Sequence, residues 1–173
     1  MQIRTATVAD IDAISGIYEA IHQEEALGLT HTGWLRGIYP TRHTAEASVA
    51  RGDMVVLEEE GRVCAAARIN ADQDSAYGVV SLPSPADPDR VLVIHTLVVD
   101  PACRGKGYAK ALIAFYEAEA LRLGRPFLRM DTNARNVRAR AMYGSLGYRE
   151  ADIIPCEFNG IPGVELVCLE KAL

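Results

Sequence analysis

The run RVLVIHTLVVDPACRGKGYAKAL, Arg90–Leu112, decides the fold because it joins a strand, a turn and a helix. Its first part, RVLVIHTLVVDP, is nearly all β-branched or apolar, which is typical of a strand buried on both faces of a sheet. Gly105 and Gly107 then make a turn. Helical spacing of apolar residues follows and predicts a helix over about Tyr108–Leu123, stopped at Gly124.

The hydrophobic pattern on both sides of this run predicts the remaining elements. Helices are expected over residues 11–28, 45–52 and 133–146, and strands over 3–7, 54–58, 63–69, 127–131, 148–157 and 164–170. Residues 71–90, with Pro83, Pro85 and Pro88, should be partly loop. A strand, a helix and a strand in succession imply a parallel crossover. The fold class is therefore α/β or α+β, with a mixed sheet and helices beside it.

Composition limits the classes of protein that fit. A chain of 173 residues is most simply one domain, residues 1–173. The net charge of −5 argues against binding to nucleic acid or to anionic membranes. The four cysteines form no CxxC pair and no zinc-ligand spacing, so we expect free thiols, no metal and a reducing compartment. The N-terminus lacks a long apolar run, which favours the cytoplasm.

The glycine turn has the properties of an anion site. Glycine lets the backbone approach a ligand, and a helix that starts at once presents free N–H groups. No Walker A string GxxxxGK[ST] occurs, and Lys110 stands where a dinucleotide fingerprint needs its third glycine. A turn whose basic residues Arg104 and Lys106 are simply solvated is the alternative reading of this string.

Two blocks of sequence carry a resemblance to a known family. RGKGYA fits the pattern R-x-x-G-x-A, a form of [QR]-x-x-G-x-[GA], after a strand and before a helix. Downstream, MDTNARNVRARAMYGSLGYRE has an Asn, a helix, a Tyr, Leu-Gly and an aromatic, namely Asn136, Tyr143, Leu146, Gly147 and Tyr148. In both blocks, and in the order of its elements, the chain resembles the GNAT superfamily of N-acetyltransferases.

The resemblance implies a fold and a binding mode for acetyl-coenzyme A. Two central parallel strands, Leu92–Val99 and Phe127–Asp131, should splay apart and admit the pantetheine arm. Asn136 should hydrogen-bond that arm. The main chain of Leu97, Val98 and Val99 should pair with the arm, and the pyrophosphate should lie on the backbone of Arg104, Gly105, Lys106, Gly107, Tyr108 and Ala109.

The implied reaction moves an acetyl group from a thioester to an amine. An alkylamine has a pKa of about 10.4, so removing its proton at pH 7 costs roughly 4.6 kcal/mol. Tyr143 is implied as the acid that protonates the leaving thiolate and as a contact of the cofactor. His95 is unexpected in an apolar strand and is the candidate base, although ordered water is the alternative. Strand alternation predicts that His95 shares a face with Val93, Leu97 and Val99.

The function expected from the resemblance is an acetyl-coenzyme A-dependent N-acetyltransferase that works by direct transfer. A noncatalytic acyl-coenzyme A-binding sensor is the alternative, because its cofactor site would look the same. The acceptor is a small-molecule or peptide amine whose identity the sequence leaves open. The resemblance also implies a homodimer.

Overall fold

A computed structural model describes residues 1–80, 82 and 87–173 of the chain. Its strands form one sheet in the order β1-β2-β3-β4-β5-β7-β6, with β4 and β5 parallel and the other neighbours antiparallel. The predicted mixed α/β sheet is therefore confirmed. The strands are β1 (Gln2–Thr5), β2 (Met54–Glu59), β3 (Arg62–Asn70), β4 (Val91–Val99), β5 (Phe127–Asn133), β6 (Arg149–Phe158) and β7 (Ile161–Ala172).

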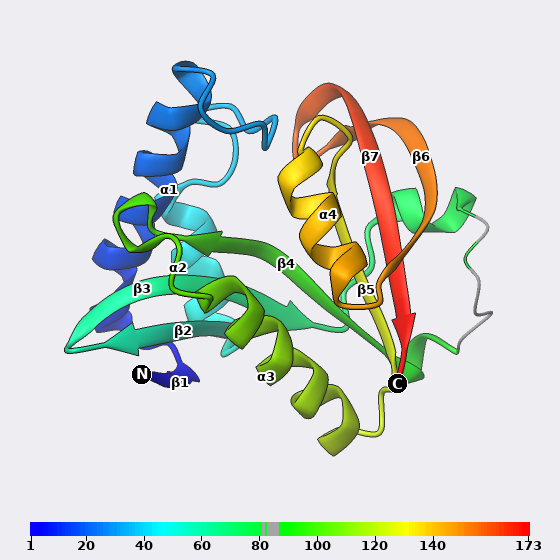
Figure 1. Ribbon diagram of the computed structural model, residues 1–173, viewed down its shortest axis with the longest axis horizontal. Coiled ribbons are helices and arrows are strands. Elements are labelled where there is room, and N and C mark those ends of the chain that lie inside the picture. Colours follow the sequence, from blue (N-terminus) through cyan, green and yellow to red (C-terminus); the bar gives the residue numbers. More distant parts are fainter. Residues whose placement is uncertain (81, 83–86) are drawn as a thin grey trace.

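Helices cover both faces of the sheet. In the view of Figure 1, α3 and α4 lie in front of the sheet, and α1 and α2 lie behind it. The helices are α1 (Ile11–Ala26), α2 (Arg42–Arg51), α3 (Tyr108–Arg122) and α4 (Val137–Ser145). The predicted loop over 71–90 contains two short 3-10 turns, Ser75–Val79 and Pro88–Arg90, while Pro83 and Pro85 lie outside the described residues. No helix of the described part is long and apolar enough to cross a membrane.

The two faces of the sheet carry separate apolar cores. One core packs α3 onto the sheet and includes Leu112, Tyr116 and Leu128. The other packs α1 onto the opposite face and includes Ile14 and Ala66. Each helix buries its apolar stripe against one face, so the sheet edges and the space between strands remain available for a site.

The parallel strands β4 and β5 separate soon after they begin. They pair only over Val91–Val93 and Phe127–Arg129, and Figure 1 shows them diverging beyond that point. Tyr116 occupies the fork, where its hydroxyl donates to Leu92 O at 2.6 Å and accepts from Arg129 N at 3.1 Å. The predicted splay is present, and beyond Val93 the edge of β4 that faces β5 has no partner strand among the described residues.

A bulge in β4 overturns the predicted alternation of its side chains. Thr96 has φ of +50°, and the register between β3 and β4 shifts there. Leu97 and Val99 pack against the α3 core together with Ile94, whereas His95 pairs across with Arg68 on the α1 face. The prediction that His95 shares a face with Leu97 and Val99 is wrong, because one extra residue reverses the alternation that follows it.

The helix predicted over residues 133–146 starts later than expected. Strand β5 continues to Asn133, whose Oδ1 accepts a hydrogen bond from Arg135 N at 3.0 Å and so makes a turn. Asn136 then caps α4 by accepting from Ala139 N at 3.3 Å. A local side-chain hydrogen bond thus competes with the helix and delays its first residue to Val137.

Candidate active site

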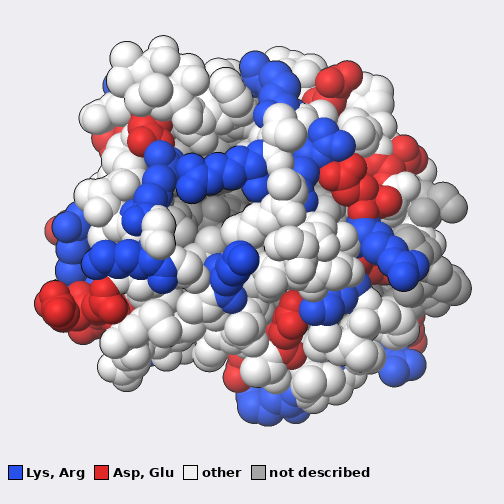
Figure 2. Space-filling view, viewed as in Figure 1, with Lys and Arg blue, Asp and Glu red and all other residues white. Residues whose placement is uncertain are grey.

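A large cleft opens where β4 and β5 have separated. Its volume is about 780 Å³, and it runs from the N-terminus of α3 past the main chain of β4 to α4. Figure 2 shows Lys and Arg side chains around a hollow on this face of the molecule. Of the residues predicted to bind the cofactor, those that line the cleft are Leu97, Val98, Val99, Arg104, Gly105, Gly107, Tyr108, Ala109, Asn136 and Tyr143.

The turn before α3 presents unpaired backbone N–H groups to this cleft. Gly105 and Gly107 have φ of +83° and +81°, in the left-handed region that glycine adopts without strain. The first hydrogen bond of the helix runs from Ala111 N to Gly107 O at 3.0 Å. Within the described residues, the amides of 105–107 have no backbone acceptor, and those of 108–110 belong to the open first turn of the helix. The turn can therefore bind an anion.

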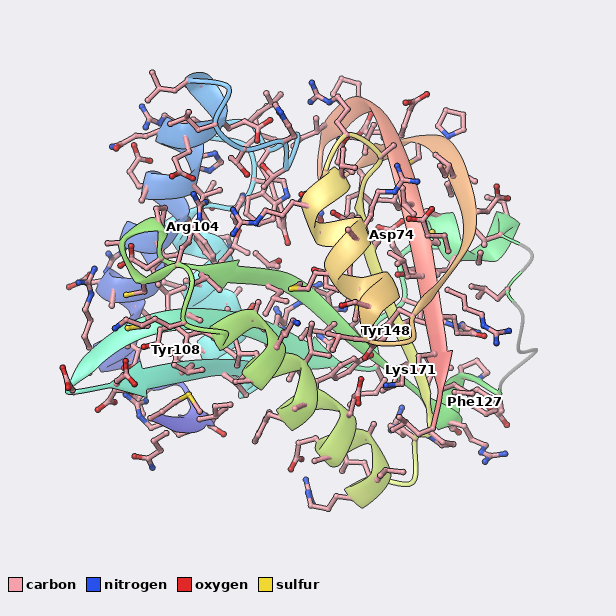
Figure 3. All side chains as sticks on the ribbon, in the orientation of Figure 1. Asp74, Arg104, Tyr108, Phe127, Tyr148 and Lys171 are labelled. Atoms are coloured by element: carbon pink, nitrogen blue, oxygen red, sulfur yellow. The ribbon has the colours of Figure 1, made fainter. Side chains whose placement is uncertain are left out.

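Side chains of the same turn pair with carboxylates, although Arg104 and Tyr108 also line the cleft. Figure 3 shows Arg104 on this turn, and its guanidinium pairs with Glu24 of α1, with Nη1 2.7 Å from Oε1. Lys106 lies 3.3 Å from Glu59 and does not line the cleft, unlike the other residues predicted for the cofactor. The Tyr108 hydroxyl donates to the same Glu59. These contacts hold the turn in place and leave its backbone to meet the ligand.

Three cationic side chains line the cleft in addition to Arg104. They are Lys110 of α3, Arg135 before α4, and Arg138 of α4. Lys110 was not among the predicted cofactor residues. Its position in the first turn after the glycines is the signal that could have found it, because cations there add to the positive end of the helix dipole.

A second, smaller cavity adjoins the large cleft. It has a volume of about 90 Å³ and includes His95, Thr96, Asp131 and Tyr39 in its wall. The two cavities share Thr32, Trp34, Leu97, Asn136 and Tyr143. A molecule in the small cavity would therefore face the end of a ligand that fills the large one.

The loop between α1 and α2 closes the small cavity. Glu25 of α1 fixes this loop by accepting hydrogen bonds from Thr32 N at 2.7 Å and from Gly33 N at 3.1 Å. Further along, the Tyr39 hydroxyl is hydrogen-bonded to the hydroxyl of Thr96 at the β4 bulge. The loop and the bulge thus build one wall together.

Tyr143 forms a wall common to both cavities. It projects from α4, and its residue surface is 7% exposed. Burial raises the pKa of its hydroxyl, and the nearby Asp131 raises it further. The hydroxyl therefore stays protonated at neutral pH and can donate a hydrogen bond into the junction of the two cavities.

Asp131 is the functional candidate that the sequence prediction missed. It lies near the end of β5 in the wall of the small cavity, and its Oδ2 accepts a hydrogen bond from the Tyr77 hydroxyl at 3.1 Å. Burial raises the pKa of this carboxyl to about 7. The sequence prediction assigned Asp131 only to a strand end. Its place near the carboxyl end of a parallel strand was a usable signal, because ligands bind there in open α/β sheets.

His95 lines the same cavity but is a weak base. Burial lowers the pKa of its ring to about 3. Asn70 donates its amide N–H groups to Asp53 at 2.8 Å and Asp72 at 3.0 Å, so its Oδ1 is the atom that faces the ring. The Nε2 of His95 therefore carries a proton and donates it to that oxygen at 3.1 Å.

Both the sequence and the fold of the chain are similar to those of GNAT-family acetyltransferases. A model of the acetyltransferase (GNAT) family matches residues 17–148. No curated protein matches the sequence. Among solved structures, a GNAT-family acetyltransferase from Listeria monocytogenes 4b F2365 is similar with a TM-score of 0.76 and 20% identity, over 99% of this chain and 94% of that chain.

Two further solved structures are similar over all or nearly all of their lengths. The putative acetyltransferase yncA of Salmonella typhimurium, solved with acetyl-CoA, has a TM-score of 0.69 and 24% identity, over 100% of this chain and 94% of that one. A ribosomal-protein-alanine N-acetyltransferase of Brucella melitensis has a TM-score of 0.71 and 22% identity, over 100% of both chains. At these identities the likeness concerns the fold.

Proposed function

The chain belongs to the acetyltransferase (GNAT) family and is an N-acetyltransferase, and from this premise we propose that it moves the acetyl group of acetyl-coenzyme A directly onto a primary amine of an acceptor in the small cavity. The main support for the proposal is that the two cavities adjoin and share part of their lining. Tyr143 forms a wall of both, and Asp131 lies in the wall of the smaller one.

The donor site fits acetyl-coenzyme A by its unpaired polar groups. The free amides of residues 105–110 and the cations around them suit a pyrophosphate. The unpaired edge of β4 at Leu97–Val99 suits the amides of a pantetheine arm, which would take the place of the missing strand. Asn136 uses its Oδ1 in the cap of α4, so its Nδ2 is left to donate to that arm.

The acceptor amine must lose a proton to react. We assign the proton acceptor to Asp131, because a base works best when its pKa lies near the operating pH, and burial raises the pKa of this carboxyl to about 7. The low pKa of His95, about 3, makes it a poorer base at neutral pH. Tyr77 holds one oxygen of Asp131, which leaves the other for the amine.

Bond making and bond breaking then follow from the geometry. The amine nitrogen attacks the thioester carbonyl carbon, the new C–N bond forms, and the C–S bond breaks. Asp131 has taken the proton of the ammonium before the attack, and the second proton, which the nitrogen loses as the amide forms, replaces the one that Tyr143 supplies to the sulfur. The protonated hydroxyl of Tyr143 donates a hydrogen bond to the departing sulfur and then supplies its proton.

Release of free thiol from acetyl-coenzyme A, measured with a panel of primary amines, tests this proposal. We expect Tyr143→Phe and Asp131→Asn each to lower kcat by about 10²-fold or more, with the acetyl-coenzyme A-induced rise in Tm retained. His95→Gln, which keeps a donor near Asn70, should lower kcat less than Asp131→Asn. An unchanged kcat in Tyr143→Phe would contradict the role of Tyr143 as the acid. If His95→Gln lowered kcat more than Asp131→Asn does, His95 and not Asp131 would be the base.

A further inference from the structure

Arg68 of β3 is half-buried and has no counterion among the described residues. Its register pairs it with His95 of β4 and with Met54 of β2, which places its side chain on the α1 face of the sheet. Its Nε is buried and has no hydrogen-bond partner. Within the described part of the chain, no carboxylate lies within 4.0 Å of its guanidinium; other arginines are paired, for example Arg129 with Glu170 at 3.0 Å.

A second orphaned donor lies in the same neighbourhood. The hydroxyl of Tyr18, on α1, is buried and finds no hydrogen-bond partner in the described part of the chain, and the residue is 2% exposed. Burial raises the pKa of Tyr18, and the charge of Arg68 partly opposes that rise. Buried donors are nearly always satisfied in native proteins, so two unsatisfied donors that interact electrostatically indicate a missing acceptor.

Neither Arg68 nor Tyr18 is among the residues that line the small cavity, but both lie close to residues that do. Cross-strand neighbours have Cβ atoms about 5 Å apart, so Arg68 adjoins His95, whose ring lines the cavity. The charge of Arg68 also acts on Tyr39 and Asp131, two other residues of the cavity wall. Arg68 and Asp131 nevertheless form no ion pair with each other among the described residues.

We propose that the acceptor is a free amino acid, whose carboxylate is bound by Arg68 and Tyr18 and whose amine is turned toward Asp131. This inference rests on the proposed function and names its substrate class. A carboxylate offers two acceptor oxygens, which match the fork of a guanidinium and a hydroxyl donor. The cavity of about 90 Å³ suits a small zwitterion. A peptide N-terminus brings an amine but no neighbouring carboxylate, so it leaves both donors unsatisfied.

The test compares free amino acids with their carboxamides as acceptors in the thiol-release assay. The two members of each pair differ in one charge and share their side chain. We expect kcat/KM for the acids to exceed that for the amides by about 10²-fold, which corresponds to losing a hydrogen-bonded charge. Arg68→Met should remove this preference by lowering the value for the acids. Tyr18→Phe should reduce it by about 10-fold.

Arg62→Met is the matched control. Arg62 belongs to the same strand, is exposed, and pairs with Asp100 at 2.6 Å, away from the cavity. It should keep the preference of the wild type. The acetyl-coenzyme A-induced rise in Tm, measured for every variant, shows that the fold and the donor site are intact. If Arg68→Met does not fold, two other measurements test the acceptor class. They are the effect of Tyr18→Phe and the wild-type ratio of kcat/KM for the amino acids to that for their carboxamides.

The outcomes separate this inference from the function on which it rests. Amides or peptide N-termini acetylated as fast as free amino acids would overturn the acceptor class and leave the N-acetyltransferase intact. An unchanged acid preference in folded Arg68→Met would overturn the role of Arg68. Absence of thiol release with every amine, together with a normal acetyl-coenzyme A-induced rise in Tm, would overturn both.

Discussion

A half-buried carboxyl such as Asp131 works as a base only above its own pKa. Burial and, to a smaller extent, the charge of Asp74 together raise its pKa to about 7. Below pH 7 the carboxyl is protonated and cannot accept a proton from the amine. We therefore expect kcat/KM to fall as pH falls through about 7, approaching 10-fold for each pH unit below it. This fall is the acidic limb of the pH–rate profile, and a pH series of thiol release measures it.

Asp74→Asn is a sharp control for the pH dependence of Asp131. The Asp74 side chain accepts a hydrogen bond from Ala76 N at 2.8 Å, and Asn can accept the same bond. Removing its charge should move the acidic limb to lower pH and leave the maximum rate unchanged. In Asp131→Asn the limb should vanish from the residual activity. A limb near pH 7 that survives in Asp131→Asn would contradict the assignment.

Gly33 is a residue whose small size the loop over the small cavity requires. Its φ is +75°, and a Cβ at this position would overlap Nδ2 of Asn133. Gly33→Ala should therefore destabilise the protein by about 2 kcal/mol, from strain and from displacement of Asn133. Thermal unfolding measures this cost. Gly37→Ala, with φ of +81° and open space around the Cβ, should cost only the strain, and equal losses would contradict the overlap.

Some residue-level features could not be read from the sequence. Threonine is β-branched and rarely adopts a positive φ, so nothing in HTLVV indicates that Thr96 bulges. The bulge then reverses the faces of the three residues that follow. Asp131 likewise reads as an ordinary strand residue, because its burial depends on Tyr77, which is distant in sequence. Long-range contacts of this kind have no local pattern.

At the scale of elements, the predicted bounds agreed better with the structure than the predictions for single residues did, because each element is predicted from a repeating pattern. The β4 run, the glycine turn and α3 were expected within a residue or two of their observed bounds, since apolar periodicity and glycine stops act locally. The start of α4 was placed too early. Asn133 and Asn136 use their side chains to make a turn and a cap, and such hydrogen bonds compete with helix formation.

In the proposed function, the turn before α3 binds the donor through its backbone, so a glycine substitution there is informative. Gly107 has φ of +81° and open space for a Cβ, so Gly107→Ala meets strain but no overlap. A shift of the backbone away from this conformation redirects the free amides. We expect Gly107→Ala to cost about 1 kcal/mol in stability, and to weaken acetyl-coenzyme A binding about 10-fold.

Gly61→Ala is the matched control for Gly107→Ala. It lies in the turn between β2 and β3, has φ of +75°, and likewise has open space around its Cβ. Its loss of stability should be similar, but its affinity for acetyl-coenzyme A should equal that of the wild type. Calorimetric titration measures both affinities. Equal affinities for the Gly107 and Gly61 variants would show that the turn does not bind the donor.

At the scale of the whole molecule, a net charge of −5 coexists with a cationic cleft. Arg104 forms an ion pair with Glu24. Lys110 and Arg138 are therefore the cations in the cleft that are most available to the donor's phosphates. We expect the double variant Lys110→Ala, Arg138→Ala to weaken acetyl-coenzyme A binding about 10-fold or more at low salt. Binding of acetyl-pantetheine, which lacks the nucleotide phosphates, should not change.

Arg122→Ala is the control for this charge effect. Arg122 ends α3 and pairs with Glu119 at 2.7 Å, so its removal alters net charge without touching the cleft. It should leave both affinities unchanged. An equal loss for acetyl-coenzyme A and acetyl-pantetheine in the double variant would mean that Lys110 and Arg138 shape the cleft rather than attract phosphate.

The unpaired edge of β4 also bears on how such a protein can change over generations. In the proposed function, main-chain groups bind the donor there, and every residue type except proline supplies the same N–H and C=O. In the same proposal, the side chains of Arg68, Tyr18 and Asp131 bind the acceptor. Substitutions can therefore exchange one acceptor for another while the donor stays constant.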